Sequence, residues 1–318
     1  MRVRNLHILP KFRDGWSYLY VEHCRIDQDS KAIAIHDVNG KVPVPCANLG
    51  LLMLGPGVSI THAAVSVLAD HGCLITWTGE GGIRFYAAGM GETRSASNFL
   101  HQAKMWADPE SRIEVVRNLY QIRFAEKLDS SLSIKQIRGM EGVRVRDAYA
   151  KASRETGVEW KGRNYQRNEW SCADPVNRAL STANSCLYGI CHTAIVSAGF
   201  SSALGFIHTG KMLSFVYDIA DLYKTEITIP ASFKTVAEEE ITDLERRVRL
   251  SCRDRFVETR LLARIIPDIQ KALGLNNLTI TENKDPDWEM ALPGSLWDPE
   301  NGKVEGGKVY LPGKEEGE

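Results

Sequence analysis

One short segment contains most of the residues that could carry chemistry. Between positions 205 and 224 it holds one imidazole, His208, and two carboxylates, Asp218 and Asp221. A further carboxylate, Glu141, lies upstream in an arginine-rich run. One imidazole with two or three carboxylates suits a hard divalent ion, Mg²⁺ or Mn²⁺, and the imidazole favours Mn²⁺. Phosphodiester chemistry is the natural use of such an ion.

The spacing of the two aspartates predicts that they share one face of a helix. Asp218 and Asp221 are three residues apart, about 300° of rotation at about 100° per residue, and we expect Lys211 and Ser214 close by on that face. The opposite, buried stripe is expected to comprise Met212, Phe215, Val216, Ile219 and Tyr223. An ordinary solvated helix face would show the same periodicity, so this alternative stays open.

His208 does not fit the helical spacing of the aspartates. Gly205 and Gly210 flank it, which predicts a turn from which the imidazole folds back over the carboxylates. A single histidine is more often a satisfied core residue than a ligand. Together with Glu141, however, the set amounts to one imidazole and two or three carboxylates.

Basic residues bracket the proposed ligands on both sides. Such fixed positive charge suits phosphate oxygens, although a run of charges is usually only a solvated face. The residues are Arg138, Arg144 and Arg146 around Glu141, with Lys211 and Lys224 around the aspartates.

Two other stretches have the composition of a nucleic-acid surface. Residues 160–170 alternate aromatic and basic side chains, which suits a DNA backbone and a splayed base, or simply a loop fixed by two tryptophans. A later helix carries six arginines over positions 246–260, some of which could pair with neighbouring carboxylates.

Composition and charge place the protein among ordinary soluble globular chains. Of 318 residues, 43% are apolar and 25% charged, and the seven cysteines include no Cys-x-x-Cys pair, so we expect a reducing cytoplasm. We find no signal peptide and no run long enough to span a membrane. Residues 281–318 hold ten acidic and four basic residues, so an acidic tail of −6 leaves a body of +5 within the total of −1.

The pattern of apolar residues predicts an α+β fold. A small β-rich, sandwich-like domain with one helix, His62–Asp70, is expected over residues 1–88, followed by a linker at 89–94. A larger all-α catalytic domain follows over 95–274, with a central helix after Asp174, and an acidic, flexible tail over 275–318. The expected helices are 95–107, 109–127, 133–138, 141–156, 175–198, 212–224, 237–266 and 268–273.

Several of these motifs together resemble one known family. They are Asn-Ser-Cys-Leu-Tyr-Gly-Ile at 184–190, Gly-Phe-Ile-His-Thr-Gly-Lys at 205–211, Ser-Phe-Val-Tyr-Asp-Ile-Ala-Asp at 214–221, and Ile-Arg-Gly-Met-Glu-Gly at 137–142. The chain closely resembles the CRISPR spacer-acquisition integrase called Cas one, of subtype I-E.

The resemblance implies a metal-dependent DNA integrase and endonuclease that acts as a homodimer with a small partner, Cas two. In that family the complex holds a short duplex with splayed ends and joins its 3′-hydroxyls to the ends of a CRISPR repeat by transesterification. The implied metal ligands are Glu141, His208 and Asp221, and Asp218 is implied as a fourth catalytic residue. DNA-contact positions that match are Arg84, Arg138, Arg163, Tyr165, Trp170, Tyr188, Lys211, Lys224, Arg246 and Arg249.

The chain departs from subtype I-E at three positions that concern DNA ends. Ser59 and Ser66 stand where members carry arginines, and His23 stands where they place an end-stacking tyrosine. His23 offers less stacking area, so the way in which DNA ends are splayed is open. Two alternative functions also stay open: a structure-specific nuclease for branched DNA, and a non-catalytic DNA-binding scaffold.

Overall fold

The computed structural model describes residues 19–79, 85–89, 96–164, 174–238, 243–275 and 296–304. The chain forms two compact units, residues 1–276 and 277–318. In the first unit all strands lie before residue 90, and helices make up most of the rest. The predicted α+β class is therefore confirmed. None of the helices in the described ranges has the length and apolarity that a membrane span requires.

The strand-rich region contains two four-stranded sheets. In the first, the order is β1-β5-β7-β8, where β1, β5 and β7 run parallel and β8 is antiparallel to β7. In the second, the order is β4-β3-β2-β6, with antiparallel pairs except for β2 and β6. The strands are β1 (Leu19–Val21), β2 (Arg25–Asp29), β3 (Ala32–Asp37), β4 (Gly40–Pro45), β5 (Leu51–Leu54), β6 (Ser59–Ile60), β7 (Leu74–Thr78) and β8 (Phe85–Gly89).

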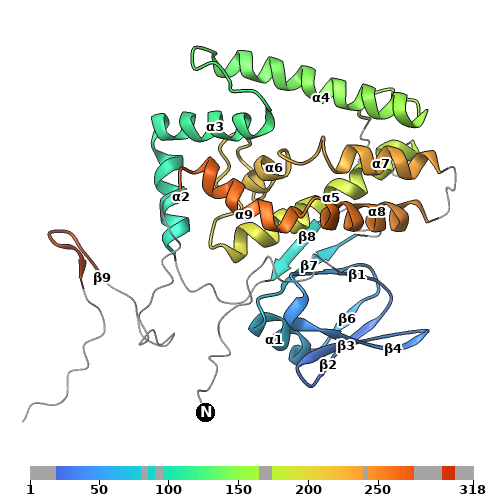
Figure 1. Cartoon of the computed structure of the whole chain (residues 1–318). Coiled ribbons are helices and arrows are strands. Elements are labelled where there is room, and N and C mark those ends of the chain that lie inside the picture. The colour runs from blue at the N-terminus through green and yellow to red at the C-terminus, as the bar shows by residue number, and fades with distance from the viewer. Residues whose placement is uncertain are drawn as a thin grey trace, which may run out of the picture. The chain divides into compact units, whose positions relative to one another are not determined.

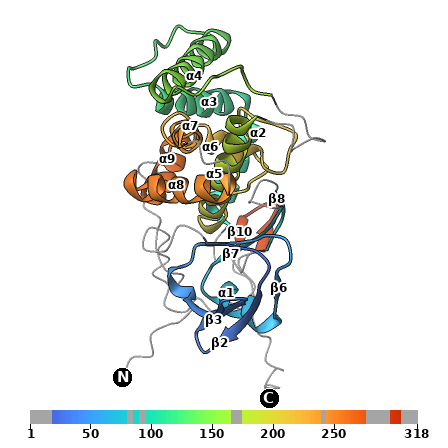
Figure 2. The same ribbon diagram turned by 90° about the vertical axis from the view of Figure 1, so that its right-hand side faces the viewer.

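The two sheets share one apolar core with helix α1 (His62–Asp70), as the sandwich-like prediction required. Ile26 and Ile33 of the second sheet pack in the same cluster as Leu52 of the first and Leu68 of α1. Figure 2 shows α1 beside β2 and β3. Thr61 caps the helix by accepting a hydrogen bond from the amide of Ala64.

Strand β5 is buried on both of its faces. Because side chains alternate along a strand, Leu52 and Leu54 point into the core between the sheets, whereas Leu51 and Met53 pack into the core of the helical region. Gly189 of the central helix permits this contact, since a Cβ there would lie 2.9 Å from Leu51 Cδ2. The first sheet and the helices therefore share buried surface.

The helical region is arranged around α5 (Pro175–Ser197), which contacts α6, α7, α8 and α9 (Figure 1). Asp174 caps α5 and Pro175 occupies its first turn, as the sequence predicted. The other helices are α2 (Ser97–Ala107), α3 (Pro109–Arg123), α4 (Ile134–Thr156), α6 (Ser214–Ala220), α7 (Thr228–Ala237), α8 (Leu244–Glu258) and α9 (Leu261–Ala272).

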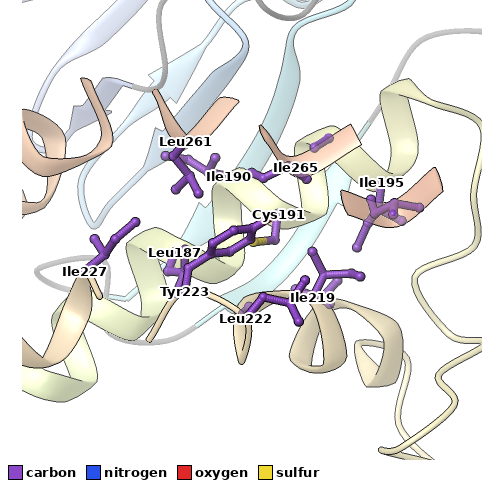
Figure 3. Close-up of a cluster of buried hydrophobic side chains, with 14 of the residues drawn as sticks. Leu187, Ile190, Cys191, Ile195, Ile219, Leu222, Tyr223, Ile227, Leu261 and Ile265 are labelled. Atoms are coloured by element: carbon purple, nitrogen blue, oxygen red, sulfur yellow. The ribbon is translucent and has the colours of Figure 1, made fainter. Parts of the chain in front are cut away.

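Small and branched side chains let α5 pack closely against its neighbours (Figure 3). Leu187 and Cys191 of α5 face Tyr223 and Ile219 in the segment that carries the candidate site, and all four are essentially inaccessible to solvent. This core fixes the segment after α6 against a rigid helix.

Several predicted helix boundaries are wrong. The predicted helices 133–138 and 141–156 are a single helix, α4, which starts at a capping box formed by Ser133 and Gln136. The predicted helix 237–266 is interrupted, because the backbone adopts φ 49° at Arg260 and separates α8 from α9. Helix α9 continues through Pro267, since burial of its apolar face outweighs one missing hydrogen bond.

Helix α7 and strands β2 and β6 were not predicted. The first residues of α7, Thr-Ile-Pro, have low helix propensity, and packing decides their conformation: Ile229 is buried and the Thr228 hydroxyl donates to Asn184 Oδ1. In β2 only Ile26 is fully buried, so the strand lacks the apolar pattern that identifies one.

The tail contains regular structure that its composition did not predict. Strands β9 (Leu296–Asp298) and β10 (Gly302–Val304) form an antiparallel hairpin. In its turn, Asp298 Oδ1 accepts hydrogen bonds from the amides of Glu300 and Asn301, and Gly302 adopts φ 72°. Local turn chemistry therefore overrides the low hydrophobicity of this segment.

The buried histidine of α5 predicts a pH dependence of stability. Burial lowers the pKa of His192 to about 4, so between pH 6.5 and 4 the unfolded chain binds a proton that the folded chain does not. Stability is therefore lost as pH falls through this window, by about 2 kcal/mol between pH 7 and pH 5. In His192→Gln, the fall in the free energy of unfolding between pH 7 and pH 5, measured by urea denaturation, should be smaller than in the parent by about that amount. An equal loss in both proteins would contradict the assignment.

Candidate active site

Four segments bring the candidate residues together. Glu141 lies within α4, Asp218 lies in α6, and Asp221 follows at the end of α6. His208 lies in the loop between α5 and α6. Arg123, at the end of α3, reaches between the carboxylates of Glu141 and Asp221. Glu141 is in the middle of its helix and not at the start that the sequence predicted.

Asp218 is completely buried and organises the loop around its carboxylate. Oδ2 accepts hydrogen bonds from the amides of Phe206 and Ile207, at 2.6 and 3.1 Å. Oδ1 accepts from the amide of His208 and lies 2.8 Å from His208 Nδ1. These four hydrogen bonds replace the water that the carboxylate loses on burial. Asp218 is therefore a positioning residue for the loop.

The contact with Asp218 determines the tautomer and the orientation of the His208 ring. Because Nδ1 lies 2.8 Å from a carboxylate oxygen, it carries the proton of the neutral ring, and Nε2 keeps its lone pair. Nε2 lies 3.9 Å from Asp221 Oδ2. The predicted turn is confirmed, since Gly210 adopts φ 79°, and the imidazole lies toward both aspartates.

Glu141 is held mainly by Arg144, one turn along the same helix. Arg144 donates from Nε to Glu141 Oε2 at 2.8 Å and from Nη2 to Oε1 at 3.0 Å. Nη1 of Arg144 donates to the Thr225 hydroxyl, which ties α4 to the segment after α6. This bidentate geometry makes Arg144 the principal partner of the Glu141 carboxylate.

Asp221 is held by Lys224, whose Nζ lies 2.6 Å from Oδ1. The ammonium also lies 5.0 Å from the centre of the Tyr188 ring. Burial acts to lower the pKa of Lys224, but Asp221 and Tyr188 outweigh it and raise the pKa above its ordinary value. Lys224 therefore stays charged beside the carboxylate.

Arg123 was not identified from the sequence, and its side chain approaches the carboxylates of both Glu141 and Asp221. Its Nη1 lies 3.3 Å from Glu141 Oε1 and 3.9 Å from Asp221 Oδ2, and its side chain is 4% exposed. An arginine in the last turn of a helix is common, because it complements the helix dipole. No sequence signal therefore distinguished it from a surface residue.

The donor set is suitable for a divalent ion, but the side chains have not closed around one position. Among the described residues, no three histidine, cysteine or carboxylate groups are close enough to hold a metal ion together. Instead, Glu141 and Asp221 both approach the guanidinium of Arg123. Carboxylate oxygens and an imidazole nitrogen match Mn²⁺ or Mg²⁺ in chemistry, so the predicted ligands fit in type.

The predicted buried stripe is confirmed for Phe215, Val216, Ile219 and Tyr223, but its other member, Met212, is 75% exposed. The predicted polar face is wrong. Helix α6 covers only residues 214–220, and its polar residues Ser214 and Asp218 are inaccessible to solvent. The loop that contains His208 accounts for the burial of Asp218, and helical periodicity does not.

The predicted DNA-contact residues fall into two groups within the described part of the chain. Arg138, Lys211 and Arg246 are exposed. The others make contacts within the chain: Arg163 donates to Asn177 and Ser181, Lys224 and Tyr188 face each other, and the Arg249 guanidinium lies 4.2 Å from the Tyr20 ring. Arg84, Tyr165 and Trp170 lie outside the described residues.

At the start of the segment 160–170, the packing of Trp160 supports the alternative of a loop that is fixed by its tryptophans. Trp160 stacks on Tyr149 with ring centres 4.4 Å apart and packs against Phe233. At the three positions that depart from the family pattern, Ser59, Ser66 and His23 are all exposed.

Removing the charge of Asp218 should destabilise the protein. In Asp218→Asn an amide NH₂ would face two N–H donors that now have a carboxylate oxygen, and the group is buried. We expect the free energy of unfolding to fall by about 3 kcal/mol or more in urea denaturation. The matched change Asp254→Asn, at an exposed ion pair, should stay within about 0.5 kcal/mol. A comparably small effect at Asp218 would be inconsistent with its role.

Gly205 should tolerate no side chain. A Cβ there would lie 2.4 Å from the carbonyl oxygen of His208 and 2.7 Å from the carbonyl carbon of Ser214, so backbone would have to move. Gly205→Ala should cost about 1–3 kcal/mol and shift the NMR resonances of the His208 ring. Gly139→Ala in α4, where nothing lies within 4 Å, should be neutral or stabilising. Unchanged His208 resonances would show that the loop does not depend on this contact.

The chain is similar to known proteins over most of its length. The family model of CRISPR associated protein Cas1 matches residues 17–125 and 117–253. CRISPR-associated endonuclease Cas1 2 of Thermus thermophilus is 56% identical over 308 residues, 96% of this chain and 94% of that protein. CRISPR-associated endonuclease Cas1 of Geobacter sulfurreducens is 43% identical over 282 residues, 88% and 92% of the two chains.

A solved crystal structure of a TtCas1–DNA complex is similar in fold. It matches with a TM-score of 0.79 at 54% identity and covers 92% of this chain and 100% of that one. The motifs around Glu141, His208, Asp218 and Asp221 thus lie in a chain that matches known members over almost its whole length. This chain belongs to the Cas1 family of CRISPR-associated proteins.

Proposed function

We propose that this chain is a metal-dependent DNA integrase of CRISPR adaptation with associated DNA endonuclease activity. Its Cas1 relatives are CRISPR-associated endonucleases. The observation that carries the proposal is the convergence of Glu141 and Asp221 on one buried guanidinium, with His208 Nε2 directed at Asp221. This proximity supports the proposal that one divalent ion would bind all three side chains once they close around it.

The proposed reaction is a direct transesterification. The 3′-oxygen of a prespacer strand forms a bond to the phosphorus at the 5′ end of a repeat strand, and the bond from that phosphorus to the 3′-oxygen of the adjoining nucleotide outside the repeat breaks. The proton of the attacking hydroxyl is lost, and the leaving oxygen takes one up. Water in place of the prespacer hydroxyl would give the endonuclease activity.

Each side chain has a role in this proposal. Glu141, His208 and Asp221 would hold Mg²⁺ or Mn²⁺, which favours ionisation of the attacking hydroxyl and stabilises charge on the phosphorus oxygens. Asp218 keeps the imidazole in the tautomer with Nε2 available. Arg144 and Lys224 hold the two carboxylates in place by ion pairs and would add positive charge beside the phosphate.

The proposed partners follow from the family resemblance and from the charge of the chain. They are a second copy of this chain, the small protein Cas two, a duplex with splayed ends and CRISPR repeat DNA, in the cytoplasm and in a system of subtype I-E. A relative has been solved with DNA bound. The exposed Arg138, Lys211 and Arg246 provide positive charge for a DNA backbone.

Neutralising one proposed ligand should abolish strand transfer. The purified chain and Cas two are incubated with Mg²⁺ or Mn²⁺, a short duplex and a supercoiled plasmid that bears a repeat. Glu141→Gln and Asp221→Asn should each lower the rate of joined product by about 100-fold or more, because each removes an anionic ligand. Glu155→Gln, at an exposed position in the same helix as Glu141, should react at the parent rate.

The same assay separates the alternative functions. Full strand transfer by Asp221→Asn would show that the site is wrongly assigned. Cleavage of branched DNA without any joined product would favour a structure-specific nuclease. Retention of DNA with neither activity would favour a scaffold.

A further inference from the structure

Arg123 occupies a position that the proposed reaction does not explain. Its side chain is 4% exposed, and it approaches the carboxylates of both Glu141 and Asp221. A buried guanidinium is costly unless charges and hydrogen bonds compensate it. Here the compensation comes from the two groups that are proposed to bind a divalent ion.

Arg123 approaches the two carboxylates less closely than their other cationic partners do. Its Nη1 lies 3.3 Å from Glu141, its Nη2 lies 3.4 Å from the carbonyl oxygen of Asp218, and the distance to Asp221 is 3.9 Å. Arg144 and Lys224, by contrast, approach the same carboxylates to within 2.8 and 2.6 Å. Each carboxylate thus has one tight partner, and Arg123 joins the two loosely.

The location of Arg123 would let its guanidinium move away from the two carboxylates without unfolding helix α3. It is the last residue of α3, and its guanidinium lies over the Tyr120 ring at 5.0 Å, a contact that does not depend on the carboxylates. Nε is buried and makes no hydrogen bond to the described residues. The side chain is therefore retained by packing and by charge, and not by a complete set of hydrogen bonds.

We propose that Arg123 is a positioning residue that takes the place of the divalent ion in the ion-free protein. It balances the charges of Glu141 and Asp221 and keeps the two carboxylates facing a common point. An ion that enters must compete with this guanidinium for both. Arg123 therefore preserves the geometry of the ion-free site and weakens ion binding. The inference rests on the proposed metal site.

The test measures ion binding and stability, and does not depend on strand transfer. Mn²⁺ affinity is measured by calorimetry and by electron paramagnetic resonance, and melting temperature is measured in EDTA. Arg123→Gln should bind Mn²⁺ at least about tenfold more tightly than the parent, because a cation near two ligands is removed. It should also melt at a lower temperature in EDTA, since the carboxylates then lack their shared cation.

Two further variants isolate the effect of charge. Arg123→Lys keeps the charge and should bind Mn²⁺ within about threefold of the parent. Arg154→Gln, at an exposed arginine of α4, should change neither affinity nor melting temperature. If Arg123→Gln folds only when Mn²⁺ is present, that result supports the proposal. If it does not fold at all, Arg123→Lys decides, and a change of tenfold or more in its affinity would overturn the charge argument.

The outcomes distinguish this inference from the proposed function. Equal or weaker Mn²⁺ binding by folded Arg123→Gln would overturn the role of Arg123 and leave the metal site in place. Absence of Mn²⁺ binding by both the parent and Arg123→Gln would overturn the metal site and, with it, this inference. Binding by Arg123→Gln alone would support the competition directly.

Discussion

The arrangement of the site depends on one buried carboxylate. Asp218 accepts hydrogen bonds from three successive amides and lies beside the ring of His208, so loop, histidine tautomer and helix α6 are fixed by a single side chain. A fully buried carboxylate is tolerated only when it is satisfied in this way. The loop and the carboxylate depend on each other, since the loop amides donate the hydrogen bonds that the buried carboxylate needs, and the carboxylate holds these amides in place. The close approach at Gly205 is the steric condition for this arrangement.

Around Asp218, the remaining residues of the site are held mainly by ion pairs between carboxylates and cations. Glu141 and Asp221 each have a close cation, Arg144 and Lys224, and Arg123 lies between them. Cations at these distances stabilise ionised carboxylates and would also attract a phosphate. The same charges would compete with a divalent ion held by the proposed ligands. The affinity for such an ion would therefore depend on the neighbouring cations as well as on the ligands.

The central helix supplies the rigidity that this balance needs. Because α5 is buried on almost every side, the segment from 218 to 224 packs against a surface that cannot yield easily, with Tyr223 and Ile219 in contact with Leu187 and Cys191. The first sheet adds to the same core through Leu51. The segment that carries the candidate site is thus supported by elements that are far from it in the sequence.

The α+β class, the capped central helix after Asp174 and the residue types of the site could be predicted from the amino-acid sequence, because they follow from periodicity, capping chemistry and local motifs. The family membership was likewise readable from short motifs. Arg123, the burial of Asp218 and helix α7 could not be predicted, since each depends on contacts between segments distant in the chain. Which carboxylate positions the loop, and which cations approach the proposed ligands, became visible in the folded chain alone, because burial and the distance between segments are properties of that chain.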